Sequence, residues 1–430
     1  MNVLNQIPGR LFLCPLLLLL MTMLVPEALN AYPLDGFAQT GIRRLNRLEL
    51  IKARTLKGPA LSPGACLTAE AIYLHPEALA VNLADTAPLM DAKLQQQVDA
   101  LFPDRDESYS LALLDISPGR PVRLALRQST RRFAVGSVGK LAVAAGLFNE
   151  LQRLFPDDIE KRQALLKNTM VTAGPWIETD HHEIPIFEPG THSFSSRPAR
   201  QGDVFSLYEW ADHMISASAN AAASTLWKEL ILMRHFNHAY PPSRQAEDTF
   251  FSTFPKKELS ALAATVVNEP LLKLNISREE FHLGNFFTRQ GKKMIPGEGD
   301  SMASPLGLLK YLLAMEQGRI VDPWSSLEIK RLMYTTARRI RYGSSPALAG
   351  AALYFKSGSL YRCGPEPGFT CKKYMGNLDN FMNSVVIVEH PDNRIYMVAL
   401  MSNVLKKNSA VDHQTLATQI EALMKLSLQP

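Results

Sequence analysis

A serine and a lysine stand three positions apart at the start of an apolar stretch, as Ser137 and Lys140. Residues 141–151 are predicted to form a helix, and side chains at positions i and i+3 of a helix share one face. The Ser137 hydroxyl and the Lys140 amine can therefore meet. A serine nucleophile needs such a neighbour, because its hydroxyl is weak until a base takes its proton. The alternative is a Ser137 that caps a buried helix, with a Lys140 amine that reaches solvent.

A second polar pair, Ser218 and Asn220, stands between two predicted helices at residues 207–215 and 221–232. A short loop at this junction can point both side chains into a cleft. There a hydroxyl can relay a proton, and an amide can hold a substrate carbonyl. The alternative is an ordinary helix N-cap.

A third polar group, Lys356 to Ser359, follows the predicted strand at residues 351–355. The Lys356 cation and the Ser357 hydroxyl suit a substrate carboxylate. Gly358 allows a ligand to approach the backbone closely. The alternative is an edge strand whose lysine and serine face solvent.

The three groups together resemble the motifs of a known family. Ser137-x-x-Lys140, Ser218-x-Asn220 and Lys356-Ser357-Gly358, in this order, are similar to those of the penicillin-recognising serine enzymes, which are the class A β-lactamases and the penicillin-binding D,D-peptidases. The resemblance covers about residues 89–430. It implies a β-lactamase/transpeptidase-like fold and a serine hydrolase that acts on a β-lactam or a peptidoglycan peptide, with no metal and no organic cofactor.

The resemblance implies a role for each matching residue in the acylation step. Ser137 would be the acylated nucleophile, and Lys140 would be a base or proton relay. A nearby Lys356 would lower the pKa of Lys140 by like-charge repulsion. Ser218 would carry the proton to the leaving nitrogen.

The resemblance also implies the substrate contacts. Asn220 would bind the substrate amide, and Lys356 and Ser357 would hold its carboxylate. The backbone N–H groups of Ser137 and Ser359 would form the oxyanion hole, which usually makes the largest single electrostatic contribution.

The sequence departs from the class A pattern where the acyl group is released. Residues 268–275 begin with Asn-Glu-Pro, but their internal spacing differs from that of the class A loop, and Ala219 stands where class A enzymes usually have aspartate. Glu269 is the candidate deacylation base. The alternative is a solvated loop carboxylate, which would leave a persistent acyl-enzyme. The protein would then be a cell-wall D,D-peptidase or transpeptidase that β-lactams inhibit. A non-catalytic binding protein on the same fold is a further alternative.

The segment Asp180-His181-His182-Glu183, with His192 beyond it, has residue types that bind metals. Adjacent histidines in a loop lack the i, i+4 spacing of helical metal ligands. We therefore predict a solvated loop and no metal site.

The elements around these motifs predict an α/β (α+β) fold, with an antiparallel sheet flanked by helices and an inserted all-helical lobe. Residues 89–135 and 345–430 would form the sheet part, and residues 136–344 the lobe. Residues 32–88 are predicted to be an N-terminal extension. The remaining predicted elements are strands at 109–116, 122–126, 384–389 and 395–401, helices at 90–102, 305–317, 325–335 and 411–426, a loop-rich stretch at 166–206, and irregular chain with several short helical pieces at 233–300.

The N-terminus predicts export. Residues 11–25 are an apolar run that is too short for a comfortable membrane span, which favours a secretory signal at residues 1–31 and a secreted or periplasmic protein. The alternative is an uncleaved anchor, the only case in which a membrane would be a partner. The chain has 46 basic and 41 acidic residues and no basic run, so nucleic acid is not an expected partner.

Export makes disulfides possible. Cys363 and Cys371 flank the turn-rich residues 364–368, which can bring the two thiols together. We predict a disulfide between them, with two free thiols as the alternative.

Overall fold

The computed structural model describes residues 35–426 except positions 60, 66 and 335–338. The predicted secretory signal at residues 1–31 lies outside the described residues. In the part of the chain that the structure describes, we find no helix with the length and apolar character needed to span a membrane.

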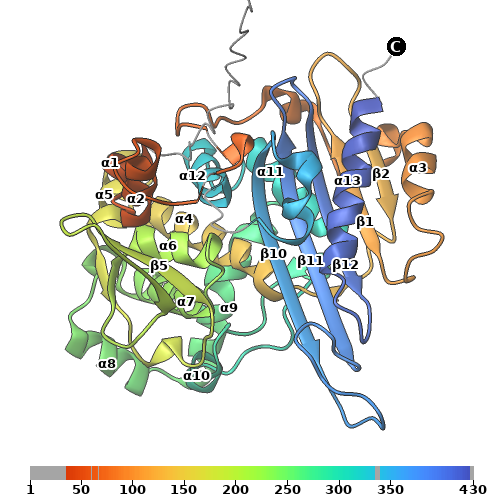
Figure 1. Cartoon of the computed structure of the whole chain (residues 1–430). Coiled ribbons are helices and arrows are strands. Elements are labelled where there is room, and N and C mark those ends of the chain that lie inside the picture. The colour runs from red at the N-terminus through yellow and green to blue at the C-terminus, as the bar shows by residue number, and fades with distance from the viewer. Residues whose placement is uncertain (1–34, 60, 66, 335–338, 427–430) are drawn as a thin grey trace, which may run out of the picture.

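Five antiparallel strands from both ends of the chain form the main sheet, as predicted (Figure 1). Their order is β10-β11-β12-β1-β2, so the C-terminal strand β12 pairs with the first strand β1, with Ser110 opposite Met401. The strands are β1 (Ser110–Asp115), β2 (Arg123–Arg127), β10 (Ala352–Arg362), β11 (Asp379–Glu389) and β12 (Ile395–Asn403). The sheet thus begins at an edge strand, β10, which carries the third motif.

Helices cover both faces of this sheet. Helices α3 (Ala92–Asp99) and α13 (Ala410–Leu426) enclose a core with one face of the sheet, and Figure 1 shows α13 running along the strands. On the other face, α11 (Pro305–Glu316) contacts β1 and β12, and α12 (Pro323–Tyr334) contacts β10. Because β1 is buried at every position, both faces must be covered by apolar side chains.

The inserted lobe is built around three long helices that pack on one another, α4 (Lys140–Leu154), α7 (Asn220–Phe236) and α9 (Lys256–Lys273). A capping box starts α6. The Ser206 side chain accepts the backbone N–H of Glu209, and the Glu209 side chain accepts the backbone N–H of Ser206. The other helices of the lobe are α5 (Ile159–Asn168), α6 (Leu207–Ile215), α8 (Arg244–Thr253) and α10 (Arg289–Met294).

Two stretches are more regular than the sequence predicts. The predicted loops at 166–206 form short antiparallel pairs, β4 with β7 and β5 with β6. The short helical pieces predicted at 233–300 are the helices α8, α9 and α10, and α9 is longer than predicted. The short strands are β3 (Phe133–Ala134), β4 (Met170–Thr172), β5 (Glu183–Glu188), β6 (Ser193–Pro198), β7 (Val204–Ser206), β8 (Phe281–His282) and β9 (Met302–Ala303).

The N-terminal residues pack against the lobe. Helix α1 (Gly36–Thr40) is followed by α2 (Arg43–Lys52), and Leu45 of α2 belongs to the main hydrophobic core. On α2, Arg44 forms a buried ion pair with Asp212 of α6, with Nε and Oδ2 2.5 Å apart. A buried arginine needs such a partner, since an unpaired buried charge is costly.

Candidate active site

The first motif begins at the junction of β3 and α4. Ser137 lies in a single 3-10 turn, η4 (Gly136–Gly139), and Lys140 is the first residue of α4. Gly136 has φ +54°, a left-handed conformation that side chains disfavour. This turn presents Ser137 to the edge strand β10.

Two glycines let the turn and the strand approach each other closely. A Cβ atom on Gly136 would lie 2.8 Å from the backbone nitrogen of Ser359, and a Cβ on Gly358 would lie 2.9 Å from that of Ser137. The backbone at Ser137 therefore lies directly against the backbone at Ser359, the two residues predicted to supply the oxyanion hole. Asn383 of β11 holds the turn in place by donating to the carbonyl oxygens of Ala134 and Val135, at 2.9 and 3.1 Å.

Replacing Gly358 by alanine is expected to slow acylation of Ser137 about 100-fold, the effect of losing one oxyanion donor. The added methyl would lie 2.6 Å from the Val135 carbonyl oxygen, so turn and strand must move apart. The measurement is the rate of covalent labelling by a penicillin. Gly350→Ala is the matched control, because a Cβ there meets nothing within 4 Å. Equal labelling rates for both variants would contradict the prediction.

Lys140 lies at the centre of the site. Its side chain is fully buried, and its Nζ donates to Ser137 Oγ at 2.9 Å, to the Ser218 carbonyl oxygen at 2.5 Å and to Asn220 Oδ1 at 2.7 Å. Burial lowers the pKa of Lys140 to about 7, although the Asp180 carboxylate opposes this change. A substantial fraction of Lys140 is therefore neutral at neutral pH and can accept a proton.

Ser218 joins the second motif to the third. It lies between α6 and α7 with φ +61°, and its Oγ accepts a hydrogen bond from Lys356 Nζ at 2.7 Å. A serine with a left-handed backbone conformation is strained, and such strain is common at functional sites, where a side chain must be held in one orientation. Ser218 and Asn220 are thus both held beside the Ser137–Lys140 pair.

Burial is the main cause of the lowered pKa of Lys140. Burial, followed by the charges of Lys140 and Arg341, also holds the pKa of Lys356 well below its ordinary value. The two amines are therefore close enough to repel each other when both are charged, and burial is the larger effect on each.

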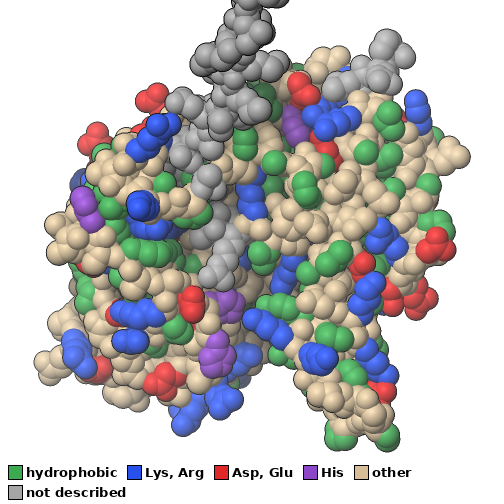
Figure 2. Space-filling model, viewed as in Figure 1, with side chains coloured by type: hydrophobic (Ala, Val, Ile, Leu, Met, Phe, Trp, Pro, Cys, Tyr) green, Lys and Arg blue, Asp and Glu red, His purple; other side chains and the backbone are tan. Residues whose placement is uncertain are grey.

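A cavity of about 910 Å³ opens over these groups. Figure 2 shows the molecule hollowed between the lobe and the sheet, with histidine and basic side chains along the hollow. Lys140 lies beneath the wall and does not line it. The predicted site residues that line the cavity are Ser137, Ser218, Asn220, Lys356, Ser357, Gly358 and Ser359.

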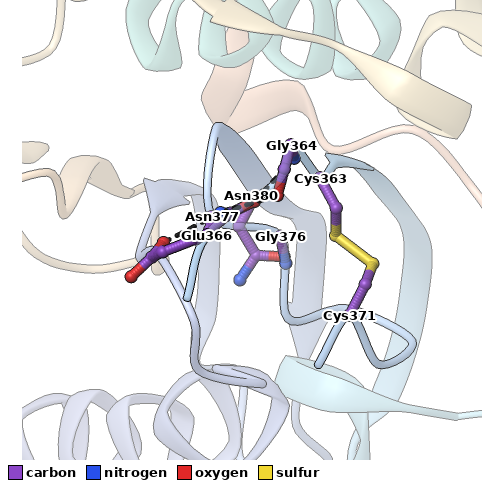
Figure 3. Close-up of a disulfide and its surroundings, with 7 residues drawn as sticks. All are labelled: Cys363, Gly364, Glu366, Cys371, Gly376, Asn377 and Asn380. Atoms are coloured by element: carbon purple, nitrogen blue, oxygen red, sulfur yellow. Dashed lines mark hydrogen bonds between the residues drawn. A yellow bond between two sulfur atoms is a disulfide. The ribbon is translucent and has the colours of Figure 1, made fainter. Parts of the chain in front are cut away.

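The β10–β11 loop borders the same cavity. Cys363 and Cys371 form a disulfide with their Cα atoms 6.1 Å apart, as predicted (Figure 3). Asn377 closes the loop further by binding both the N–H and the carbonyl of Gly364, at 2.9 and 3.1 Å. Tyr374, a little further along this loop, lines the cavity. The cross-link therefore braces a wall of the site.

Glu269, the candidate deacylation base, does not join the site. It lies on α9 in ion pairs with Arg234 and Lys273, at 2.7 and 2.8 Å, and does not line the cavity. Burial raises its pKa, but the hydrogen bonds and charges of these two cations outweigh burial and lower it. The predicted loop is the last turns of a helix, because Pro270 is accommodated within α9. The structure thus contradicts the placement on which the predicted role depends.

The acidic and histidine segment was also misplaced, since Asp180 is not in a solvated loop. Its side chain is 4% exposed, and Asp180, His181, His182 and Glu183 all line the cavity. His192 does not line it. In the sequence, the only sign of this part of the site is a cluster of titratable side chains. The contact that brings Asp180 to the site joins residues 41 positions apart, so no local pattern reveals it.

Arg341 is a site residue that the sequence did not reveal. It is nearly buried, and it donates to the Gly358 carbonyl oxygen at 2.6 Å and to Ser359 Oγ at 2.9 Å. Burial lowers its pKa from the ordinary value. A guanidinium at this point adds positive charge to the wall where a substrate carboxylate is expected.

One group of side chains in the described residues has the donor types of a metal site. His75, Glu316 and Glu389 lie together away from the cavity. The ammonium of Lys330 lies 2.7 Å from Glu316 and 2.6 Å from Glu389 and occupies the position between them where a cation would bind. We therefore interpret this group as a buried ion-pair network.

Known proteins of the same fold resemble this chain in three dimensions. A class A β-lactamase from Bacteroides cellulosilyticus DSM 14838 is 16% identical with a TM-score of 0.51, and covers 78% of this chain and 97% of its own. TLA-3 extended-spectrum β-lactamase is 11% identical with a TM-score of 0.52, and covers 78% and 99%. A mutant of PBP-A, described as an acyl-enzyme complex with penicillin G, is 15% identical with a TM-score of 0.50, and covers 77% and 96%.

These likenesses define the class of fold, which is that of the β-lactamases and penicillin-binding proteins, as the sequence predicted. No curated protein sequence matches the chain significantly. A family model described as "Beta-lactamase enzyme family" matches residues 93–423. The chain belongs to this family of serine hydrolases.

Proposed function

We propose that the protein is an exported serine hydrolase that opens a β-lactam or a related amide through an acyl-enzyme on Ser137. The observation that carries the proposal is the contact between Ser137 Oγ and the buried Nζ of Lys140, at 2.9 Å. A base whose pKa lies near the working pH is the most effective proton acceptor. The pKa of Lys140, lowered by burial to about 7, meets this requirement.

Acylation would follow from the contacts of these groups. Neutral Lys140 takes the Ser137 proton while Oγ bonds to the substrate carbonyl carbon. The N–H groups of Ser137 and Ser359 stabilise the negative oxygen. Ser218 then gives its hydroxyl proton to the leaving nitrogen as the C–N bond breaks, and regains a proton from a neighbouring lysine. The product is an ester between Ser137 and the acyl group.

The substrate would be held through its carboxylate and its amide. Lys356, Ser357 and Arg341 supply the positive charge and the hydroxyl for a carboxylate, and Asn220 supplies an amide. The candidate substrates are small β-lactams and peptidoglycan peptides. Export is proposed from the apolar residues 11–25, and a disulfide between Cys363 and Cys371 suits an oxidising compartment.

A second candidate is a cell-wall D,D-peptidase or transpeptidase that β-lactams inhibit. The position of Glu269 favours it, because Arg234 and Lys273 hold this carboxylate outside the cavity. An acyl-enzyme without any base to activate water would persist.

One experiment tests the proposal and separates the candidates. The purified protein and Ser137→Ala are incubated with a penicillin, and intact mass and drug loss are followed. Ser252→Ala, a change on an exposed helix, is the matched control and is expected to behave as wild type. We expect an adduct that is absent from Ser137→Ala. Rapid drug loss identifies a β-lactamase, and a lasting adduct identifies the inhibited peptidase. If the wild-type protein forms no adduct and destroys no drug, the proposal is overturned in favour of a binding protein.

A further inference from the structure

An aspartate and a histidine form a pair on the cavity wall. Asp180 Oδ1 lies 2.6 Å from His182 Nδ1 and also accepts the His182 backbone N–H at 3.1 Å. The Asp180 side chain is 4% exposed, whereas that of His182 is 40% exposed. The carboxylate is thus fixed within the wall, and the imidazole reaches the cavity.

The pair is tied to the Ser137 site through the start of α7. Asp180 Oδ2 accepts the backbone N–H of Ala221 at 2.8 Å. Ala221 follows Asn220, whose Oδ1 accepts from Lys140. The Asp180 carboxylate also acts on the charge of Lys140, since it raises the pKa of that lysine against the effect of burial. The carboxylate therefore lies within electrostatic range of the amine that contacts Ser137.

The hydrogen bonding of the pair leaves one nitrogen of His182 available. Burial raises the pKa of Asp180, but hydrogen bonds from His182 and Ala221, together with the charge of His182, lower it to about 2. An ionised Asp180 holds the imidazole proton on Nδ1, so Nε2 carries the lone pair of the neutral ring. A carboxylate that fixes the tautomer of a histidine in this way prepares the other nitrogen to accept a proton.

Hydrolysis of an acyl-serine needs a proton acceptor for water, and Glu269 is elsewhere. Among the described lining residues, His182 combines an orienting carboxylate with exposure to the cavity. The two oxygens of Asp180 are already engaged by Ala221 and His182. The imidazole is therefore the better placed of the two to meet a water molecule.

We propose that His182, positioned by Asp180, is the base that activates water for release of the acyl group from Ser137. His182 Nε2 takes one proton from the water as its oxygen bonds to the acyl carbon. The carbon–Oγ bond then breaks as Lys140 gives a proton to Ser137 Oγ. The imidazolium returns its proton to Lys140 through the solvent of the cavity, so both groups end as they began. The products are the free acid and the starting enzyme. This inference rests on the proposed function of Ser137.

The test separates formation of the acyl-enzyme from its decay. A fluorescent penicillin labels wild type, His182→Ala and the control His192→Ala, whose histidine does not line the cavity. Excess unlabelled penicillin is then added while the label is followed. We expect His182→Ala to acquire label at the wild-type rate and lose it about 100-fold more slowly. We expect His192→Ala to match wild type. Added imidazole should speed the decay in His182→Ala and leave that of wild type unchanged, which a purely structural defect would not allow.

Each other outcome has a definite meaning. Wild-type decay in His182→Ala overturns the inference, as does equal slowing of labelling and decay. A wild-type label that never decays also overturns it, while leaving Ser137 as the nucleophile. Failure of the wild type to acquire label overturns the proposed function, and the inference falls with it. As a second variant, Asp180→Asn is expected to slow decay more than labelling, and rescue by imidazole should be weaker there because the ring remains in place.

Discussion

Lys140→Met is expected to slow acylation of Ser137 by about 10³- to 10⁴-fold, the upper part of the range for loss of a general base. Methionine has a similar length and an apolar tip, so it fits a fully buried position. It cannot accept the Ser137 proton. It also leaves the Ser218 carbonyl and Asn220 Oδ1 without the donor they share in Lys140. The measurement is the labelling rate with a penicillin.

The pKa of Lys140 predicts how the acylation rate of the wild-type protein depends on pH. Burial lowers the pKa of Lys140 to about 7. The neutral amine is the reactive form, so the acylation rate should fall as pH decreases through about 7 and level off above it. The residual rate of Lys140→Met should lack this step.

A matched control guards against a general loss of folding. Lys310→Met changes a partly exposed lysine on α11 that pairs with Glu280, away from the cavity. Its labelling rate should equal that of wild type, and both variants should retain a cooperative thermal transition. A Lys140→Met protein that labels at the wild-type rate would show that another group takes the Ser137 proton.

The parts of the fold that the sequence predicted are those with strong local signals. Helix α11 illustrates this, because Ser304 caps its first turn, Pro305 starts it, and apolar residues fill it. The strand β12 is a continuous apolar run of buried residues. These local signals predict the structure correctly because the tertiary contacts favour the same helix and the same strand.

Helix α9 shows where a local signal misleads. The resemblance to the class A loop predicts that Asn268-Glu269-Pro270 begin a loop, and proline, which lacks a backbone N–H, is unfavourable inside a helix. In the structure, Pro270 lies inside the helix, three positions before its last residue, Lys273, and it is buried. Burial against the lobe offsets the lost hydrogen bond, and propensity alone cannot reveal such an offset.

The candidate site also contains residues that the sequence could predict and residues that it could not. The motif residues were predictable because their order along the chain resembles a family. Asp180, His182 and Arg341 were not, because their roles depend on contacts across the fold. Arg341 reaches Ser359 over 18 positions, and Asp180 reaches Ala221 over 41. No short-range pattern records these contacts.

Lys330→Met is expected to reduce the free energy of unfolding by about 3–5 kcal/mol, the cost of breaking a buried ion pair by removing one partner. Lys330 is fully buried on α12, and its Nζ lies 2.7 Å from Glu316 of α11 and 2.6 Å from Glu389 of β11. It also donates to the Tyr73 carbonyl oxygen at 2.6 Å. Methionine fills the space but leaves two buried carboxylates without their shared cation.

The effect should be large because the network joins distant parts of the chain. His75, from the N-terminal residues, lies 2.8 Å from Glu389 through Nε2, and its backbone N–H donates to Glu316 at 3.1 Å. Tyr354 of β10 donates to Glu389 at 2.8 Å. Loss of the lysine charge therefore weakens the attachment of the N-terminal segment and of α12 to the sheet. Urea denaturation followed by circular dichroism measures the change.

Two further variants distinguish this cause from a packing defect. Lys330→Met combined with Glu316→Gln removes one of the two buried carboxylate charges that the first change leaves without a cation, so it should be more stable than Lys330→Met alone. Lys310→Met breaks a partly exposed pair on the neighbouring helix and should cost about 1 kcal/mol or less. If Lys330→Met were as stable as Lys310→Met, the network would contribute no more than a surface ion pair. If the double variant were less stable than Lys330→Met, the loss would come from packing around residue 330 and not from uncompensated charge.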